Sequence, residues 1–156
     1  MTASQVSAPR HFSTVLLATD LTSASSDATD KAIGLAAQLG ARLLVVTVID
    51  SRRNSLLRPL ARPRPVEERE ERVVAANGIA QRARLAGARA TFLVWEGEPS
   101  DSILAAADAE MADLIVVGTR ARGTVGRLLG SVSDAVVHRA TVPVLVVRPE
   151  GEDRED

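Results

Sequence analysis

Residues 43–49 read Leu-Leu-Val-Val-Thr-Val-Ile, an almost uninterrupted apolar run that is rich in β-branched side chains. Residues 15–18, 114–117 and 144–147 have the same character. A strand with one face in water alternates apolar and polar residues, whereas a strand buried on both faces is apolar throughout. The four runs therefore predict strands of a parallel sheet that helices cover on both faces.

Residues 90–95, Ala-Thr-Phe-Leu-Val-Trp, predict a fifth and weaker strand, and helical patterns fill the intervals between the strands. Alternation of strands and helices favours an α/β fold with a five-stranded, parallel, doubly wound sheet. Ligands of such sheets bind beyond the carboxyl ends of the strands. The residues that follow Ala18, Ile49 and Val117 are thus the first place to look for a site.

Helix ends are marked by small and polar residues. A helix is predicted over residues 24–39, with Ser23 as its N-cap and Gly40 in a left-handed conformation at its end. A second is predicted over residues 66–86, ended by Gly87. Further helices are predicted after Pro99 and from Ser131, which we expect to act as an N-cap. Phe92 and Trp95 are expected in the core.

Composition excludes several classes of protein. The chain has 156 residues, enough for one domain with a full core, and its 19 Lys and Arg nearly balance 20 Asp and Glu. Such a balance argues against a protein that holds nucleic acid by its phosphates. The sequence has no cysteine and two distant histidines, His11 and His138, which excludes disulfides and thiolate zinc sites. No apolar run is long enough to cross a membrane, and we expect a cytoplasmic protein.

Three segments are expected to lie outside the packed fold. Residues 1–12 predict a flexible N-terminus and residues 150–156 an acidic tail, leaving residues 13–149 as the domain. Residues 51–65 hold five arginines among prolines, which predicts an exposed, mobile loop. This basic loop is either a solvated connector, which we favour, or a lid over an anionic ligand.

Residues 118–133 read Gly-Thr-Arg-Ala-Arg-Gly-Thr-Val-Gly-Arg-Leu-Leu-Gly-Ser-Val-Ser and lead from a buried strand into a helix. Glycines allow close approach of the backbone to a ligand, helix N-terminal amides bind anions, and arginines neutralise phosphates. The segment is not a P-loop, because Thr124 stands where that motif needs lysine. From these residues alone, a phosphate site and a merely flexible turn are both open.

Several motifs, taken in order, resemble the universal stress protein family. The glycine-rich segment is similar to its signature Gly-x2-Gly-x9-Gly-Ser/Thr, and Pro143 with Val144–Val147 is similar to its closing strand. Asp20 after the first strand, Asp50 after the second, and Gly97-Glu-Pro before a helix also fit. The resemblance extends over about residues 13–149. It implies an adenine nucleotide alpha hydrolase-like sheet with strand order 3-2-1-4-5.

The resemblance also implies which residues hold a nucleotide in ATP-binding members. Asp20 and Thr19 would lie against the adenosine, with the Val48 backbone on the adenine. The phosphates would be bound by residues at the end of the fourth strand, in the glycine-rich segment and in the helix that follows: Val117, Gly118, Arg120, Arg122, Arg127, Gly130, Ser131, Val132 and Ser133. The ligand would be ATP, with ADP or AMP as alternatives, and Mg²⁺ would bridge its phosphates. Asp20 could instead be only a helix cap.

The segment departs from the signature at Ala121, which replaces the second glycine, and the interval from there to Gly130 is one residue short. An alanine with positive φ would cost about 1 kcal/mol or more. Gly123 and Gly126 could restore that freedom in a shifted loop.

Two functions therefore remain open. The favoured one is an ATP-binding regulatory module of the stress response that also engages an unknown protein partner. The alternative is a dimeric interaction or scaffold protein that binds no nucleotide. No base lies beside a nucleophile in the sequence, so we expect no enzyme, and slow ATP hydrolysis cannot be assigned to any residue. The resemblance implies a homodimer that pairs through Val144–Val147.

Overall fold

The computed structural model describes residues 11–52, 65–119 and 129–150. Along the chain the elements are β1 (Thr14–Ala18), the 3-10 turn η1 (Ser23–Ser25), α1 (Ser26–Leu39), β2 (Arg42–Asp50), α3 (Pro65–Leu85), β3 (Arg89–Gly97), α4 (Pro99–Ala109), β4 (Leu114–Gly118), α5 (Ser131–Arg139) and β5 (Val144–Val147). The strands form a five-stranded parallel sheet in the order β3-β2-β1-β4-β5. This confirms the predicted fold class and strand order.

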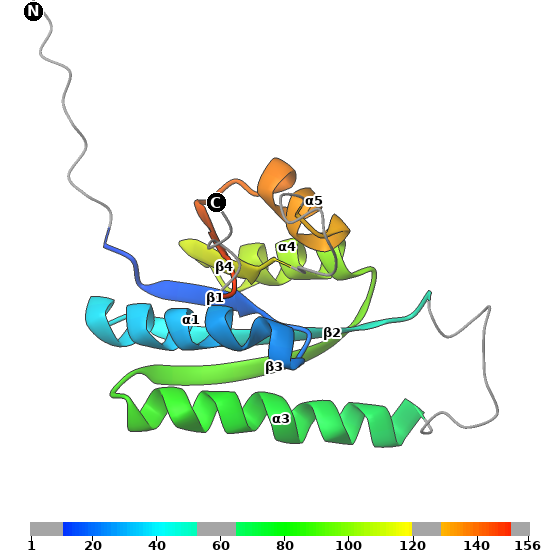
Figure 1. The fold of residues 1–156 in the computed structure, drawn as a ribbon, viewed down its shortest axis with the longest axis horizontal. Coiled ribbons are helices and arrows are strands. Elements are labelled where there is room, and N and C mark those ends of the chain that lie inside the picture. Colours follow the sequence, from blue (N-terminus) through cyan, green and yellow to red (C-terminus); the bar gives the residue numbers. More distant parts are fainter. Residues whose placement is uncertain (1–10, 53–64, 120–128, 151–156) are drawn as a thin grey trace, which may run out of the picture.

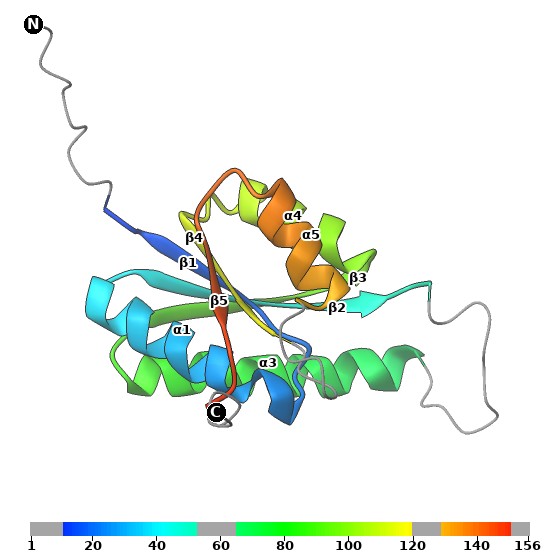
Figure 2. The same ribbon diagram turned by 45° about the horizontal axis from the view of Figure 1, so that its top comes forward.

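Helices cover both faces of the sheet, with α4 and α5 on one side and α3 on the other (Figure 1). Figure 2 shows α1 beside α3 on that second side. Alternate residues of each strand enter opposite cores. In β1, Val15 and Leu17 pack with α1 and α3, whereas Leu16 packs with α4 and α5. All three are fully buried, which explains the continuous apolar runs.

Among the described residues, no helix combines the length and the apolar character that a membrane span requires.

β3 lies at one edge of the sheet, and its burial differs from that of the central strands. Phe92 packs against the core, but Trp95 is 39% exposed, so the prediction that Trp95 is a core residue is wrong. Trp95 lies near the end of this edge strand, which has a neighbouring strand on one side only.

Two arginines of α3 bond to the open edge of β3. Arg84 donates to the Ala90 carbonyl through Nε at 3.2 Å and Nη2 at 2.8 Å, and Arg69 Nη2 donates to the Val94 carbonyl at 3.3 Å. Carbonyls of an edge strand are otherwise open to another strand. At these two positions the helix supplies the donor that a neighbouring strand would have supplied.

Helices α1, α3 and α4 end in the same hydrogen-bond pattern, with Gly40, Gly87 and Met111 in positive-φ conformations just after the last turn. The predicted ends at Gly40 and Gly87 are thus confirmed. The predicted start at Ser23 is wrong: Ser23 lies in η1, and α1 begins at Ser26. Helix α3 begins at Pro65, within the predicted loop, because proline is tolerated in a first helical turn.

Candidate functional site

A cleft of about 840 Å³ opens at the carboxyl ends of the strands. Small-molecule sites commonly have volumes of about 300–1,000 Å³. The cleft brings together nine of the predicted site residues, from the loop after β1, from β2, from β4 and from the start of α5: Thr19, Asp20, Val48, Val117, Gly118, Gly130, Ser131, Val132 and Ser133. Arg120, Arg122 and Arg127 lie outside the described residues, as do Ala121 and most of the basic loop.

β2 extends beyond the end of β1, and this overhang forms one wall of the cleft. The two strands pair only as far as Ala18 and Val46, with Thr19 N–H donating to the Val46 carbonyl at 3.0 Å. Backbone groups alternate sides along a strand, so Val48 N–H and C=O point the same way as those of Val46, past the end of β1. They present a donor and an acceptor to the cleft that Val48 lines.

The loop after β1 is held by its own side chains. Thr19 Oγ1 lies 2.9 Å from Ser25 Oγ and accepts from Leu21 N–H at 3.0 Å. Asp20 Oδ1 accepts from Thr22 N–H at 3.0 Å and from its hydroxyl at 2.7 Å. Asp20 therefore stabilises the turn before η1. Neither of these two bonds goes to the backbone of α1, so they are not a cap of that helix. Leu21 has a φ of 64° and lines the cleft.

The opposite end of the cleft is the N-terminus of α5. Gly130 is its N-cap, with a φ of −60°, so the expectation that Ser131 caps this helix is wrong by one residue. The first intrahelical bond runs from Asp134 N–H to the Gly130 carbonyl at 2.9 Å. The amides of residues 131–133 precede that bond and have no acceptor within the helix, which makes this end attractive to an anion.

Ser133 is engaged in the fold as well as in the cleft. Its side chain is buried, and its hydroxyl donates to the Gly118 carbonyl at 2.7 Å. The hydroxyl proton is therefore already used, and a phosphate contact would fall to the Ser133 amide or to exposed Ser131.

Helix α3 lines the cleft through side chains that the sequence did not single out. Arg72 Nη1 donates to Thr47 Oγ1 at 2.9 Å, and its Nη2 lies 3.5 Å from Glu68 Oε1. Thr47 is almost fully buried and Arg72 is 25% exposed. Arg72 is brought to β2 by tertiary packing, so no local pattern could have revealed it.

An ionic network crosses the rim between β2 and α4. Arg52 contacts Asp50 Oδ1 through Nε and Glu98 Oε1 through Nη2, both at 3.3 Å. Glu98 Oε2 accepts at 2.7 Å from both the Ser100 hydroxyl and Asp101 N–H, and so caps α4. Burial acts to raise the pKa of Glu98, but these hydrogen bonds and the charge of Arg52 outweigh it and lower that pKa. In the sequence, the signal for this N-cap is an acidic residue, Glu98, directly before Pro99 at the first position of the helix.

The described lining of the cleft is rich in carboxylates. It contains five acidic side chains, Asp20, Asp50, Glu68, Glu71 and Glu98, against two basic ones, Arg52 and Arg72. A phosphate bound here needs compensation from backbone amides, from a cation or from the arginines of residues 120–128. Within the described residues, no three His, Asp or Glu side chains are grouped so that they could hold a metal ion.

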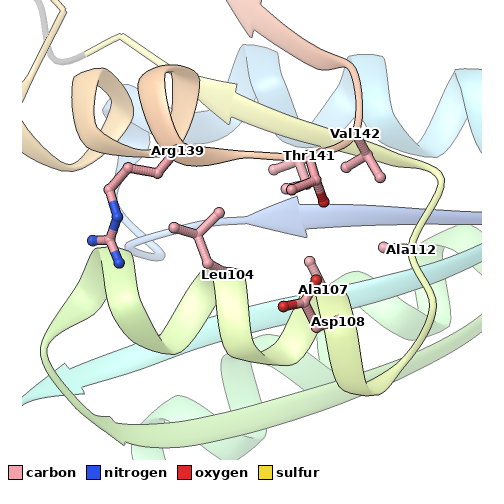
Figure 3. Close-up of a pocket in the computed structure, with 8 residues that line it drawn as sticks. Leu104, Ala107, Asp108, Ala112, Arg139, Thr141 and Val142 are labelled. Atoms are coloured by element: carbon pink, nitrogen blue, oxygen red, sulfur yellow. The ribbon is translucent and has the colours of Figure 1, made fainter.

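A second hollow lies between α4, α5 and the segment before β5 (Figure 3). Its volume is about 50 Å³, too small for a nucleotide, and Leu104, Ala107 and Val142 make it largely apolar. At its rim Arg139 Nη1 donates to Asp101 Oδ1 at 2.7 Å and ties α5 to α4. This hollow is a feature of helix packing.

Comparison with known proteins gives a consistent result. The universal stress protein family matches residues 11–148. The universal stress protein in the QAH/OAS sulfhydrylase 3′ region of Thermus aquaticus is 42% identical over 142 residues, covering 88% of this chain and 99% of the relative. A universal stress protein solved in complex with cAMP is 30% identical with a TM-score of 0.69, over 89% of this chain and 98% of that one. UspA from Lactobacillus plantarum, 22% identical with a TM-score of 0.72 over 89% and 99% of the two chains, shares the fold.

Proposed function

The chain belongs to the universal stress protein family, and we propose that it is an adenine-nucleotide-binding regulatory module whose ligand occupies the cleft at the carboxyl ends of the strands. The nucleotide, ATP or a related adenine nucleotide, would change which protein partner the module engages. A cytoplasmic setting, where we expect the protein, supplies such ligands.

The observation that carries the proposal is the overhang of β2. Val48 N–H and C=O offer a donor and an acceptor side by side, which complements the donor–acceptor edge of adenine. The free amides at the start of α5 suit a phosphate on the far side of the same cleft. Asp20, between these two walls, is suited to ribose hydroxyls, because a carboxylate accepts hydrogen bonds.

The relative solved with cAMP supports an adenine nucleotide as the ligand class. The excess of carboxylates in the described lining repels phosphates, so each further phosphate of the nucleotide makes binding less favourable. We propose that ATP binds with Mg²⁺, which offsets the repulsion between its phosphates and this lining.

Assembly through β5 forms part of the proposal. β5 is an edge strand whose four residues are each half-buried, and β4 bonds to only one side of it. A second copy paired there would cover the open edge. We assign no catalytic step to the protein, since Glu98, the carboxylate that accepts from the Ser100 hydroxyl in this cleft, is engaged as the cap of α4.

The test is calorimetric titration of the nucleotide-free protein with AMP and with ATP, each with and without Mg²⁺. Gly130→Asp and Gly130→Asn form a matched pair: both side chains are good N-caps and have the same bulk, but only Asp repels phosphate. We expect saturable binding by the wild type, retained by Gly130→Asn and weakened at least about tenfold by Gly130→Asp. No binding by the wild type would refute the proposal and leave the dimeric interaction protein as the function to pursue.

A further inference from the structure

We infer that Arg72 determines the specificity of the cleft for a purine base, by stacking its guanidinium plane on one face of the ring. The inference rests on the proposed function and adds to it the residue that selects the base. It starts from the chemistry of the wall: no aromatic side chain is found among the described residues that line the cleft. Stacking on a base there therefore falls to another flat group, and guanidinium planes stack on bases.

The guanidinium of Arg72 is fixed before any ligand arrives. Nη1 donates to Thr47 Oγ1 at 2.9 Å, and Nη2 pairs with Glu68 one helical turn earlier at 3.5 Å. Donors of a guanidinium point outward in its plane, so both partners hold its edge and neither covers its faces. Anchoring of this kind lowers the entropy lost when the side chain orders on a ligand.

Thr47 and Val48 are neighbours on β2, which places Arg72 beside the part of the cleft that lies past the end of β1. The side chain of Thr47 points to the α3 side of the sheet, where Arg72 lies, while the Val48 backbone faces along the sheet into that part of the cleft. A base paired edge-on with Val48 would continue the plane of the sheet. Its α3-side face would then meet Arg72.

The other face of the same base would meet α4. Ile103 and Pro99 line the cleft, and Ile103 packs in the core on the α4 side of the sheet. The base would thus lie in a slot that has Arg72 on its α3 side, Ile103 on its α4 side and the Val48 peptide at its edge. A two-ring purine would overlap the guanidinium over a larger area than a one-ring pyrimidine, so the slot favours adenine over cytosine.

The test compares adenosine, AMP and CMP binding by the wild type, Arg72→Lys and Arg69→Lys. Arg72→Lys keeps the charge, the helix propensity and the pairing with Glu68 but loses the plane. Arg69→Lys is the matched control, because Arg69 is on the same helix and bonds to Val94, outside the cleft. We expect Arg72→Lys to weaken adenosine and AMP equally, by about tenfold, to change CMP little, and Arg69→Lys to change nothing.

Thr47→Val is a second variant, because it removes the anchor of Nη1 and leaves Arg72 in place. We expect an intermediate loss for adenosine. Circular dichroism with thermal unfolding checks that each variant is folded.

Three outcomes would overturn the inference. Unchanged adenosine binding in a folded Arg72→Lys variant would remove the stacking role while leaving nucleotide binding intact. A loss seen with AMP but not with adenosine would assign Arg72 to the phosphate. No binding of any nucleoside or nucleotide by the wild type would refute the proposed function itself, and this inference with it.

Discussion

The hydroxyl of Ser133 donates a 2.7 Å hydrogen bond to the carbonyl of Gly118, and so joins the first turn of α5 to the end of β4 across fifteen positions of sequence. These two residues are the first and the last of the glycine-rich segment. The contact therefore fixes the distance between the two ends of that segment.

Ser133→Ala should lower the free energy of unfolding by about 1–2 kcal/mol, since it removes a buried hydrogen bond. Ser133→Thr keeps the hydroxyl and should recover most of that loss. Ser131→Ala is the control and should change stability by less than about 0.5 kcal/mol, because Ser131 is exposed. Urea denaturation measures all three; equal effects at both serines would contradict a structural role specific to Ser133.

Met111→Gly should stabilise the protein by about 1 kcal/mol. Met111 has a φ of 52° at the end of α4, where α1 and α3 have glycine, and its side chain is 80% exposed. Glycine removes the clash of Cβ in this conformation at the cost of some entropy in the unfolded state. Met111→Ala keeps the clash and should leave the thermal midpoint nearly unchanged. A Met111→Gly midpoint at or below that of the wild type would rule out strain at this residue.

Glu98→Gln should destabilise the protein at neutral pH and not at low pH. The pKa of Glu98 is lowered in the fold, so its ionised form adds stability that is present above its ordinary value of 4.5 and is lost as the pH falls through the folded pKa. The glutamine side chain would keep an acceptor for the cap but lose the charge. Denaturation at pH 7 and again below pH 4 should show a difference between the two proteins that shrinks on acidification; a constant difference would mean that the charge of Glu98 contributes nothing.

Val146→Pro should convert a β5-paired dimer to monomer in size-exclusion chromatography with light scattering. The Pro143 carbonyl accepts a hydrogen bond from β4, and the Val147 carbonyl accepts one from the residue that follows β4. Backbone groups alternate sides along a strand, so the N–H of Val146 points to the open edge. Proline removes that donor without touching the β4 bonds. Val146→Ala loses similar packing and should remain dimeric. A dimer of Val146→Pro would place the interface elsewhere, and a monomeric wild type would refute it.

Much of the fold could be predicted because its signals are local. Central strands buried on both faces show as continuous apolar runs, and Gly40 and Gly87 mark helix ends by the conformation that they alone adopt cheaply. Trp95 was misplaced because exposure at an edge depends on which strand is last in the sheet. Strand order followed from family resemblance and not from periodicity.

The candidate site was predictable in part for the same reason. Nine predicted residues line one cleft because the carboxyl ends of parallel strands meet at one edge. Arg72 and Glu68 come from within a helix and enter the site only through packing against β2. Asp113 is a similar case: it precedes β4, yet its carboxylate accepts from Ser13 and Thr14, about 100 positions away. Contacts between residues so far apart in the chain cannot be predicted from the pattern of neighbouring residues in the sequence.

The arginines along β3 have a consequence for how large an assembly can become. A subunit with two receptive edges can polymerise, since every addition exposes a fresh edge of the other kind. Here Arg84 and Arg69 donate hydrogen bonds to carbonyls along β3, and that edge is therefore poorly able to pair with a strand of another subunit. If copies join at β5, that edge is covered in the pair, and the two arginines hinder further strand pairing at β3. Assembly then stops at the dimer. Fibre formation is disfavoured by two arginine side chains at β3, at the opposite edge of the sheet from the β5 interface.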